Sequence, residues 1–178
     1  MTRYVALFES INVGGNRLTM ADLRYAFERE EFEDVETVVA SDNVLFSFDE
    51  RPAEGLEDLF AHMMRERFDM ESFVAVRNGD EIAAAIEGNP FRSQGADNMV
   101  HTHFLAMQPS PERAAELIKV QAERGPEKLA MGDRSLFIDY SSSAGDTRLT
   151  SAFITRRLGC DGTGRDMRSL ARILDKMR

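Results

Sequence analysis

The sequence has no tryptophan and only one cysteine, three histidines and five prolines among 178 residues. The single cysteine, Cys160, excludes an internal disulfide framework and is typical of a reducing compartment. The alternative, a reactive nucleophile, needs a partner histidine that the neighbouring sequence does not supply. No apolar run approaches the span of a bilayer, and Glu9 and Asn12 interrupt the N-terminal apolar stretch. These absences predict a cytoplasmic chain without a signal peptide or a membrane partner.

What the sequence does contain is charge, unevenly distributed along its length. Residues 1–90 carry 20 acidic and 8 basic side chains, a net charge of −12, whereas residues 91–178 carry 11 and 14, a net charge of +3. Such asymmetry is typical of an anion or nucleic-acid surface in the basic half, or of two complementary halves that dock together. A chain of this length buries roughly 70% of its unfolded surface and needs no disulfide or metal to hold a core.

The first half, residues 1–78, predicts the order strand, helix, strand, strand, helix, strand. Arg3 to Glu9 is apolar on both faces, as a central strand is. Thr19 predicts a helix N-terminus, because Asp22 stands at the capping-box position. The remaining elements are strands at Val35 to Ala40 and Val44 to Phe48, a helix opened by Pro52, and a strand at Phe73 to Val76.

The second half, residues 79–178, repeats this order with an extra helix at each end. Its predicted elements are a helix at Asp80 to Glu87, a strand at Val100 to Met107, a helix begun by Ser110 and Pro111, a hairpin over Glu127 to Met131 and Ser135 to Tyr140, a helix at Leu149 to Leu158, an extended piece at Cys160 to Thr163, and a helix from Asp166 that buries Met167, Leu170, Ala171, Leu174 and Met177. The pattern predicts an α+β fold of two ferredoxin-like (split βαβ) halves in tandem, with antiparallel sheets and helices packed on one face. We expect the halves to form one compact unit.

Two glycine-containing segments are candidates for anion binding. Gly14-Gly15-Asn16 follows a strand and precedes a capped helix, where backbone N–H groups hold phosphates in many α/β proteins. The alternative is that these glycines only let the chain turn. The second segment, Gly162-Thr163-Gly164-Arg165, is expected to enter the last helix with Thr163 as N-cap and Arg165 beside the helix start. The basic residues that follow at helical spacing form a stripe that is either a ligand surface or a solvated or salt-bridged face: Arg165, Arg168, Arg172 and Lys176.

His101 and His103 lie two apart in a strand and therefore share a face, as paired metal ligands do. No third ligand is identifiable by spacing, so we expect a polar strand face and no metal or cofactor. His62 is predicted to lie on the surface. Nucleic-acid binding is not expected, because no RNA-binding strand signature occurs and a first half at −12 repels phosphate.

Several strings resemble those of the bacterial family catalogued as domain of unknown function 1697. They run in order along nearly the whole chain: Tyr4-Val5-Ala6-Leu7, Ile11-Asn12-Val13-Gly14-Gly15-Asn16, Ser41-x-Asn43-Val44-x-Phe46, Asn89-Pro90-Phe91, Phe104-Leu105 and Thr163-x-Arg165. The resemblance implies an α+β chain of two ferredoxin-like halves and no known activity. Members usually carry Arg-Gly where this chain has Glu9-Ser10, and glycine where it has Asp42.

Two hypotheses for function follow, and neither assigns a reaction. The first is a ligand-binding protein, or an enzyme of unassigned class, that binds a small anionic ligand, a nucleotide or a phosphate or carboxylate. Its site is expected where the Gly14-Gly15 loop, the Ser41 to Asn43 turn and the Thr163 to Arg165 helix start converge. Its predicted binding residues are Asn12, Gly14, Gly15, Asn16, Ser41, Asn43, Thr163 and Arg165. The alternative is a protein interaction or homo-oligomeric assembly module without catalytic activity, in which acidic and basic surfaces pair between the copies of a homodimer.

Overall fold

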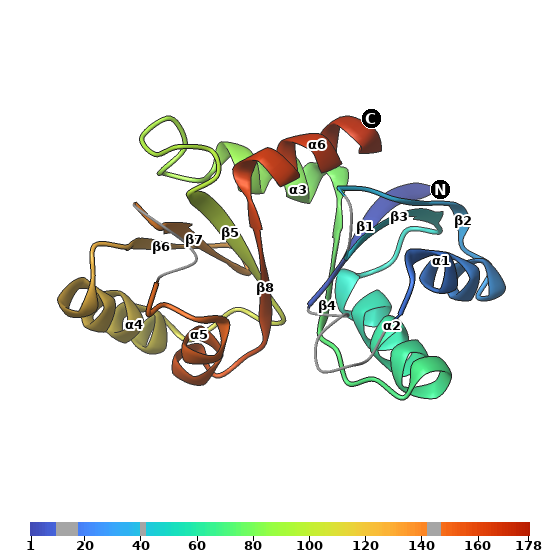
Figure 1. The fold of residues 1–178 in the computed structure, drawn as a ribbon, viewed down its shortest axis with the longest axis horizontal. Helices are drawn as coiled ribbons and strands as arrows, with labels where there is room; N and C mark the ends of the chain where they lie inside the picture. The colour runs from blue at the N-terminus through green and yellow to red at the C-terminus, as the bar shows by residue number, and fades with distance from the viewer. Residues whose placement is uncertain (10–17, 40–41, 142–146) are drawn as a thin grey trace. The chain divides into compact units, whose positions relative to one another are not determined.

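A computed structural model describes residues 1–9, 18–39, 42–141 and 147–178 (Figure 1). Contacts within the chain divide it into two units. Unit 1 comprises Met1–Ile82 and Arg172–Arg178, and unit 2 comprises Ala83–Ala171. We describe each unit by itself. The expectation that residues 1–78 and 79–178 form separate halves of one compact unit stays a prediction.

Unit 1 is built on a four-stranded antiparallel sheet in the order β2-β3-β1-β4. Its elements are β1 (Thr2–Phe8), α1 (Met20–Arg29), β2 (Glu33–Thr37), β3 (Asn43–Phe48), α2 (Ala53–Phe68) and β4 (Val74–Asn78). The two strands that precede helices, β1 and β3, are central, and the two that follow helices form the edges. This is the ferredoxin-like arrangement.

Local chemistry explains where α1 begins. Thr19 has extended backbone angles, and its hydroxyl accepts a hydrogen bond of 3.0 Å from the backbone N–H of Asp22. The Asp22 carboxylate accepts one of 3.4 Å from the Thr19 N–H. The predicted capping box is therefore confirmed, and it satisfies two of the backbone donors that a helix start leaves without partners.

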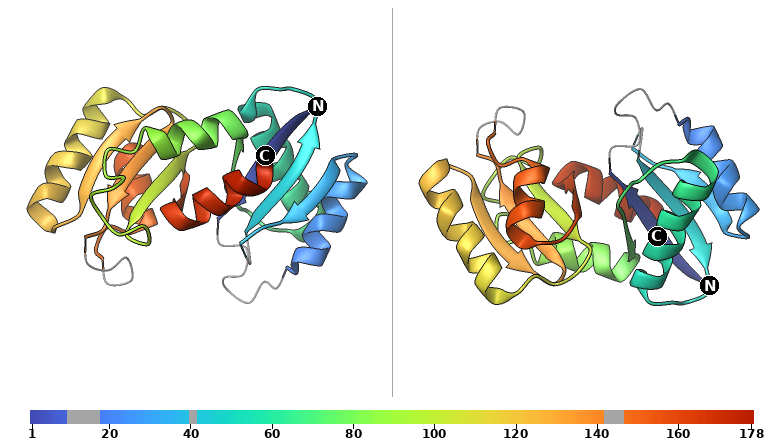
Figure 2. Two further views of the ribbon diagram at one scale, coloured as in Figure 1. Left: turned by 90° about the horizontal axis from the view of Figure 1, so that it is seen from above. Right: turned by 90° about the horizontal axis from the view of Figure 1, so that it is seen from below.

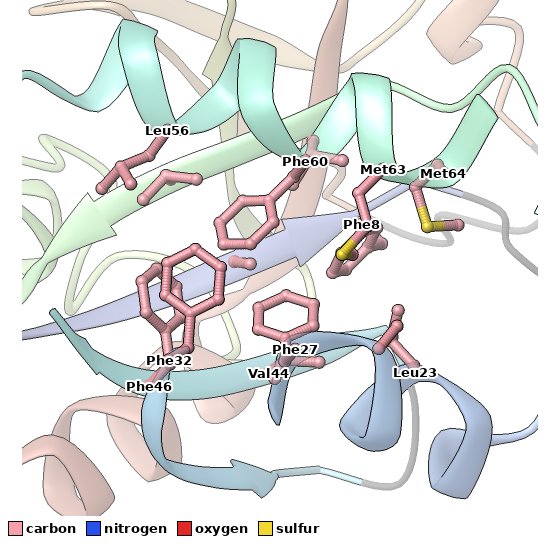
Figure 3. Packing of buried hydrophobic residues seen from close by; sticks show 14 of the residues in the cluster. Phe8, Leu23, Phe27, Phe32, Val44, Phe46, Leu56, Phe60, Met63 and Met64 are labelled. Atoms are coloured by element: carbon pink, nitrogen blue, oxygen red, sulfur yellow. The ribbon is translucent and has the colours of Figure 1, made fainter. Parts of the chain in front are cut away.

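Aromatic side chains fill the core of unit 1 between the sheet and its two helices (Figure 3). Phe27 of α1 stacks on Phe60 of α2 with ring centroids 4.5 Å apart, and Phe46 of β3 meets both rings edge-on. Phe8 of β1 joins them from the centre of the sheet. The residues of β1 from Tyr4 to Phe8 are all buried, as predicted for a central strand.

Unit 2 repeats the arrangement, with strand order β6-β7-β5-β8. Its elements are β5 (Val100–Leu105), α4 (Pro111–Arg124), β6 (Lys128–Gly132), β7 (Ser135–Asp139), α5 (Ser151–Leu158) and β8 (Gly162–Asp166). Two further helices, α3 (Gly79–Glu87) and α6 (Met167–Met177), begin in one unit and end in the other. The helices α4 and α5 cover one face of the sheet (Figures 1 and 2), where they bury Leu105, Leu136 and Ile138. The tandem ferredoxin-like fold is confirmed.

The prediction for Thr163 as a helix N-cap is wrong. Thr163 and Arg165 lie in β8, which pairs antiparallel with β5, and Asp166 caps the helix that follows by accepting a hydrogen bond of 2.7 Å from the Ser169 N–H. The two glycines of this segment resemble a turn in the sequence, but pairing with a distant strand outweighs that local preference. Arg165 therefore does not belong to the helical stripe.

The expected buried face of α6 also needs a correction. Met167 and Leu170 are buried as predicted, but Ala171 is exposed and Leu174 and Met177 are only partly buried. Ile173, which the sequence pattern did not single out, is fully buried instead. The buried positions of α6 are therefore 167, 170 and 173, three residues apart on one side of the helix.

Candidate functional site

Five of the predicted binding residues lie outside the described residues: Asn12, Gly14, Gly15, Asn16 and Ser41. Of the other three, Asn43 belongs to unit 1, whereas Thr163 and Arg165 belong to unit 2. The convergence of the three connections on one site therefore stays a prediction. The geometry of Asn43 and of the pair on β8 can be described separately.

Asn43 closes the hairpin between β2 and β3. Its side chain is 2% exposed, and the amide nitrogen donates a hydrogen bond of 3.1 Å to the carbonyl oxygen of Val38. The Val38 N–H in turn donates one of 3.1 Å to the Asn43 carbonyl. This reciprocal pair gives Asn43 a structural role in the hairpin.

Thr163 and Arg165 share one face of β8, the face turned away from α4 and α5. The register pairs Arg165 with Thr102 of β5 and pairs Gly164 with His103. Paired residues of an antiparallel ladder project from the same face of the sheet, so Thr102, Thr163 and Arg165 lie together. One guanidinium nitrogen of Arg165 donates to the Thr163 hydroxyl at 2.8 Å and to the Gly164 carbonyl at 2.9 Å, and these bonds fix the direction of the side chain.

The hydroxyl of Thr102 is the unusual member of this group. Thr102 is 0% exposed, yet its Oγ1 has no hydrogen-bond partner in the part of the chain that the structure describes. Leaving a buried hydroxyl without a partner costs about 1–3 kcal/mol. Thr163, two residues from Arg165, is 3% exposed. Two buried hydroxyls and a guanidinium thus share one small area of the sheet.

His101 and His103 lie on the opposite face, beneath the helices, and not on a polar strand face as expected. His103 is 2% exposed, and among the described residues its Nε2 has no hydrogen-bond partner. Burial lowers the pKa of His103 from 6.5 to about 4, and the positive charges of Arg165 and His101 act in the same direction. His103 is therefore neutral at physiological pH.

The glycines of β8 make room for that ring. A Cβ on Gly162 would lie 2.6 Å from His103 Cδ2 and 2.9 Å from Leu105 Cδ2, and a Cβ on Gly164 would lie 3.2 Å from His103 Nδ1. These glycines, which the sequence analysis assigned to a flexible helix entry, instead accommodate the buried imidazole. Among the described residues, no group of three or more His, Cys, Asp or Glu side chains is placed to hold a metal ion.

Cys160 does not have the properties of a nucleophile. It belongs to the core beneath α5, and its Sγ lies 3.8 Å from the carbonyl oxygen of Met107. Burial raises the pKa of the Cys160 thiol, so the thiolate that a nucleophilic cysteine needs is disfavoured.

The sequence pattern of a family described as "Protein of unknown function (DUF1697)" matches residues 1–137. The chain belongs to this family. No curated protein matches the chain. Among solved structures, the conserved bacterial protein SP0830 from Streptococcus pneumoniae is similar in fold, with 22% sequence identity, a TM-score of 0.71 and 99% of each chain covered.

The family match and the structural likeness cover different parts of the chain. The family pattern ends at residue 137, within β7, so the strand that carries Thr163 and Arg165 lies beyond it. The likeness to SP0830 extends over the whole chain, including β8 and α6. No helix of the described residues is both long enough and apolar enough to cross a membrane.

Proposed function

We propose that this DUF1697 protein binds a small anionic ligand through the face of β5 and β8 that carries Arg165. A phosphate or carboxylate group is the chemistry that this face fits. A guanidinium presents its N–H donors in a plane that matches two oxygens of such a group. The hydroxyl groups of Thr102 and Thr163 can donate further hydrogen bonds to the oxygens of the ligand.

The observation that carries the proposal is the buried Thr102 hydroxyl beside Arg165. Buried polar groups in native proteins nearly always have partners, and those that lack one in an unliganded structure are often satisfied by a ligand or an ordered water. A ligand oxygen at this position would accept from Thr102 Oγ1 and from Arg165. The Arg165 guanidinium is already directed by Thr163 and Gly164, so little side-chain ordering would oppose binding.

The test is thermal-shift screening with inorganic phosphate, nucleotides, phosphosugars and small carboxylates at constant ionic strength. A ligand at 100 times its Kd stabilises the folded state by about 2.7 kcal/mol, which is readily detected. Arg165→Ala is expected to reduce the shift. The matched control is Arg168→Ala, because Arg168 is 64% exposed and lies 3.5 Å from the Asp166 carboxylate. A shift that Arg165→Ala leaves undiminished would contradict the proposal.

Thr102→Val supplies an independent readout, since it keeps the shape of the side chain and removes the hydroxyl. The unliganded variant is expected to be at least as stable as the parent, because the buried hydroxyl has been removed. The rise in melting temperature that the ligand causes is expected to be smaller in Thr102→Val than in the parent. Light scattering across a salt series distinguishes ligand binding from the assembly alternative. The assembly alternative predicts a dimer that dissociates as the salt concentration rises, and no response to anions.

A further inference from the structure

Unit 1 contains a cavity of about 250 Å³ between the end of β2 and the last turns of α6. Its walls are formed by Thr37, Val38, Val39, Arg172, Asp175 and Lys176. None of these residues belongs to the face of β5 and β8 described above. The cavity is therefore a separate feature of the other unit.

The three charged residues come from one face of α6. Positions 172, 175 and 176 are three and four residues apart, which brings side chains to the same side of a helix. All three residues are exposed. Within the described part of the chain, neither Arg172 nor Lys176 takes part in an ion pair. The cavity therefore has two cationic groups and one carboxylate on the same wall.

The part of the lining that follows β2 includes a residue with strained backbone angles. Val39 has a φ of +56°, a left-handed conformation that a β-branched side chain rarely adopts. Strain of this kind is concentrated at binding and switch sites. The neighbouring hydrogen bonds between Val38 and Asn43 hold the chain in place at this point.

From this arrangement we infer that the cavity binds a small oxyanion, with Arg172 and Lys176 as its cationic partners. The two positive groups outnumber the single carboxylate, so the wall attracts an anion. A volume of about 250 Å³ lies just below the usual range of drug-sized pockets and fits a molecule of few atoms. Asp175 weakens the attraction and accepts a hydrogen bond from a ligand hydroxyl. The shared chemistry is a phosphate or carboxylate group, free or on a small hydroxylated molecule.

The experiment measures binding of inorganic phosphate to the full chain by calorimetry at constant ionic strength. The double variant Arg172→Gln/Lys176→Gln is expected to lose affinity about tenfold, because it removes both cationic partners of the oxyanion. The charge-matched control is Arg156→Gln/Arg157→Gln, exposed on α5, which is expected to keep the parental affinity. The affinities for glycerol phosphate and for acetate, compared with that for inorganic phosphate, show which of these oxyanions the cavity prefers.

Further variants make each outcome decisive. Asp175→Asn is expected to raise phosphate affinity several-fold, and this result does not depend on the double variant being folded. In an Arg165→Ala background, where the β8 face no longer binds phosphate, the Arg172→Gln/Lys176→Gln substitutions are expected to cause the same loss, so failure of the β8 proposal and failure of this inference give different results. Equal losses in both double variants would show general charge attraction and overturn the inference. Absence of phosphate binding to the parent, or undiminished binding to the Arg172→Gln/Lys176→Gln variant, would overturn it as well.

Discussion

Acid is expected to destabilise unit 2 through the buried histidine of β5. His103 is 2% exposed and its Nε2 has no hydrogen-bond partner among the described residues. Burial, with the positive charges of Arg165 and His101, lowers the pKa of His103 to about 4, against 6.5 for an unperturbed histidine. Between these two values the unfolded chain binds a proton that the folded protein does not. The free energy of unfolding is therefore not reduced by His103 above pH 6.5, and it falls as the pH is lowered towards 4.

The size of the effect follows from the same two values. Each pH unit between the folded and unfolded pKa corresponds to about 1.4 kcal/mol for a single titrating group. The gap between 6.5 and about 4 thus amounts to roughly 3 kcal/mol. This is a large share of the 5–15 kcal/mol that typically stabilises a folded domain, roughly a fifth to three fifths. Carboxylates also titrate near the lower end of this range, so the contribution of His103 must be isolated by a variant.

The assay is urea unfolding between pH 7.5 and pH 4, followed through the backbone amide signals of β5 by NMR. His103→Leu removes the titrating ring and keeps an apolar side chain of similar size. The stability difference between the parent and this variant is expected to change by roughly 3 kcal/mol in favour of the variant as the pH falls. His62→Gln on the exposed face of α2 is the control and is expected to follow the parent at every pH.

If the free energy of unfolding of His103→Leu instead differs from that of the parent by the same amount at every pH, that result refutes this reasoning. A direct NMR titration of the imidazole gives a second check. A His103 ring that titrates near 6.5 in the folded protein would show that it is solvated, contrary to the burial on which the magnitude depends.

Further substitutions at three positions, with controls, test local features of the fold by chemical denaturation. Gly162→Ala is expected to cost about 1–3 kcal/mol, because its Cβ would lie 2.6 Å from a buried imidazole, whereas Gly55→Ala on α2 meets nothing within 4 Å and is expected to stabilise by up to about 1 kcal/mol. Thr19→Ala removes the capping box of α1 and is expected to cost about 1 kcal/mol, with Thr19→Ser retaining most of the stability. Glu57→Leu is expected to cost about 3 kcal/mol or more, because the Glu57 carboxylate accepts a hydrogen bond of 3.3 Å from the buried guanidinium of Arg77; a loss below 1 kcal/mol would show that this pair is not needed.

The fold could be predicted where neighbouring residues decide the structure. The alternation from Tyr4 to Phe8 predicted a strand buried on both faces, and Thr19 with Asp22 predicted the start of α1, because both signals act over a few residues. The segment from Gly162 to Asp166 could not be read in this way. Its strand conformation comes from pairing with β5, about 60 residues earlier in the chain, and sequence periodicity does not show such a partner.

The candidate site shows the same limit. The two-residue spacing correctly placed His101 and His103 on one face, but β5 is buried on both faces, so the spacing could not show which face lies under the helices. Thr102, between them, had no distinguishing signal in the sequence. It becomes notable only because β8 brings Arg165 opposite it and because its hydroxyl is buried without a described partner.

The four basic residues that the sequence placed on one helical stripe have three different environments. Arg165 is on a strand, oriented by the Thr163 hydroxyl; Arg168 lies beside the Asp166 carboxylate; and Arg172 and Lys176 line a cavity in the other unit. The four residues of the predicted stripe therefore do not form one basic surface. A continuous basic surface is what a nucleic-acid backbone requires, because its affinity depends on many phosphate contacts at once. Separate cations beside hydroxyls or in a small cavity instead favour individual small anions, and the Arg165 and Arg172/Lys176 variants should therefore affect binding independently.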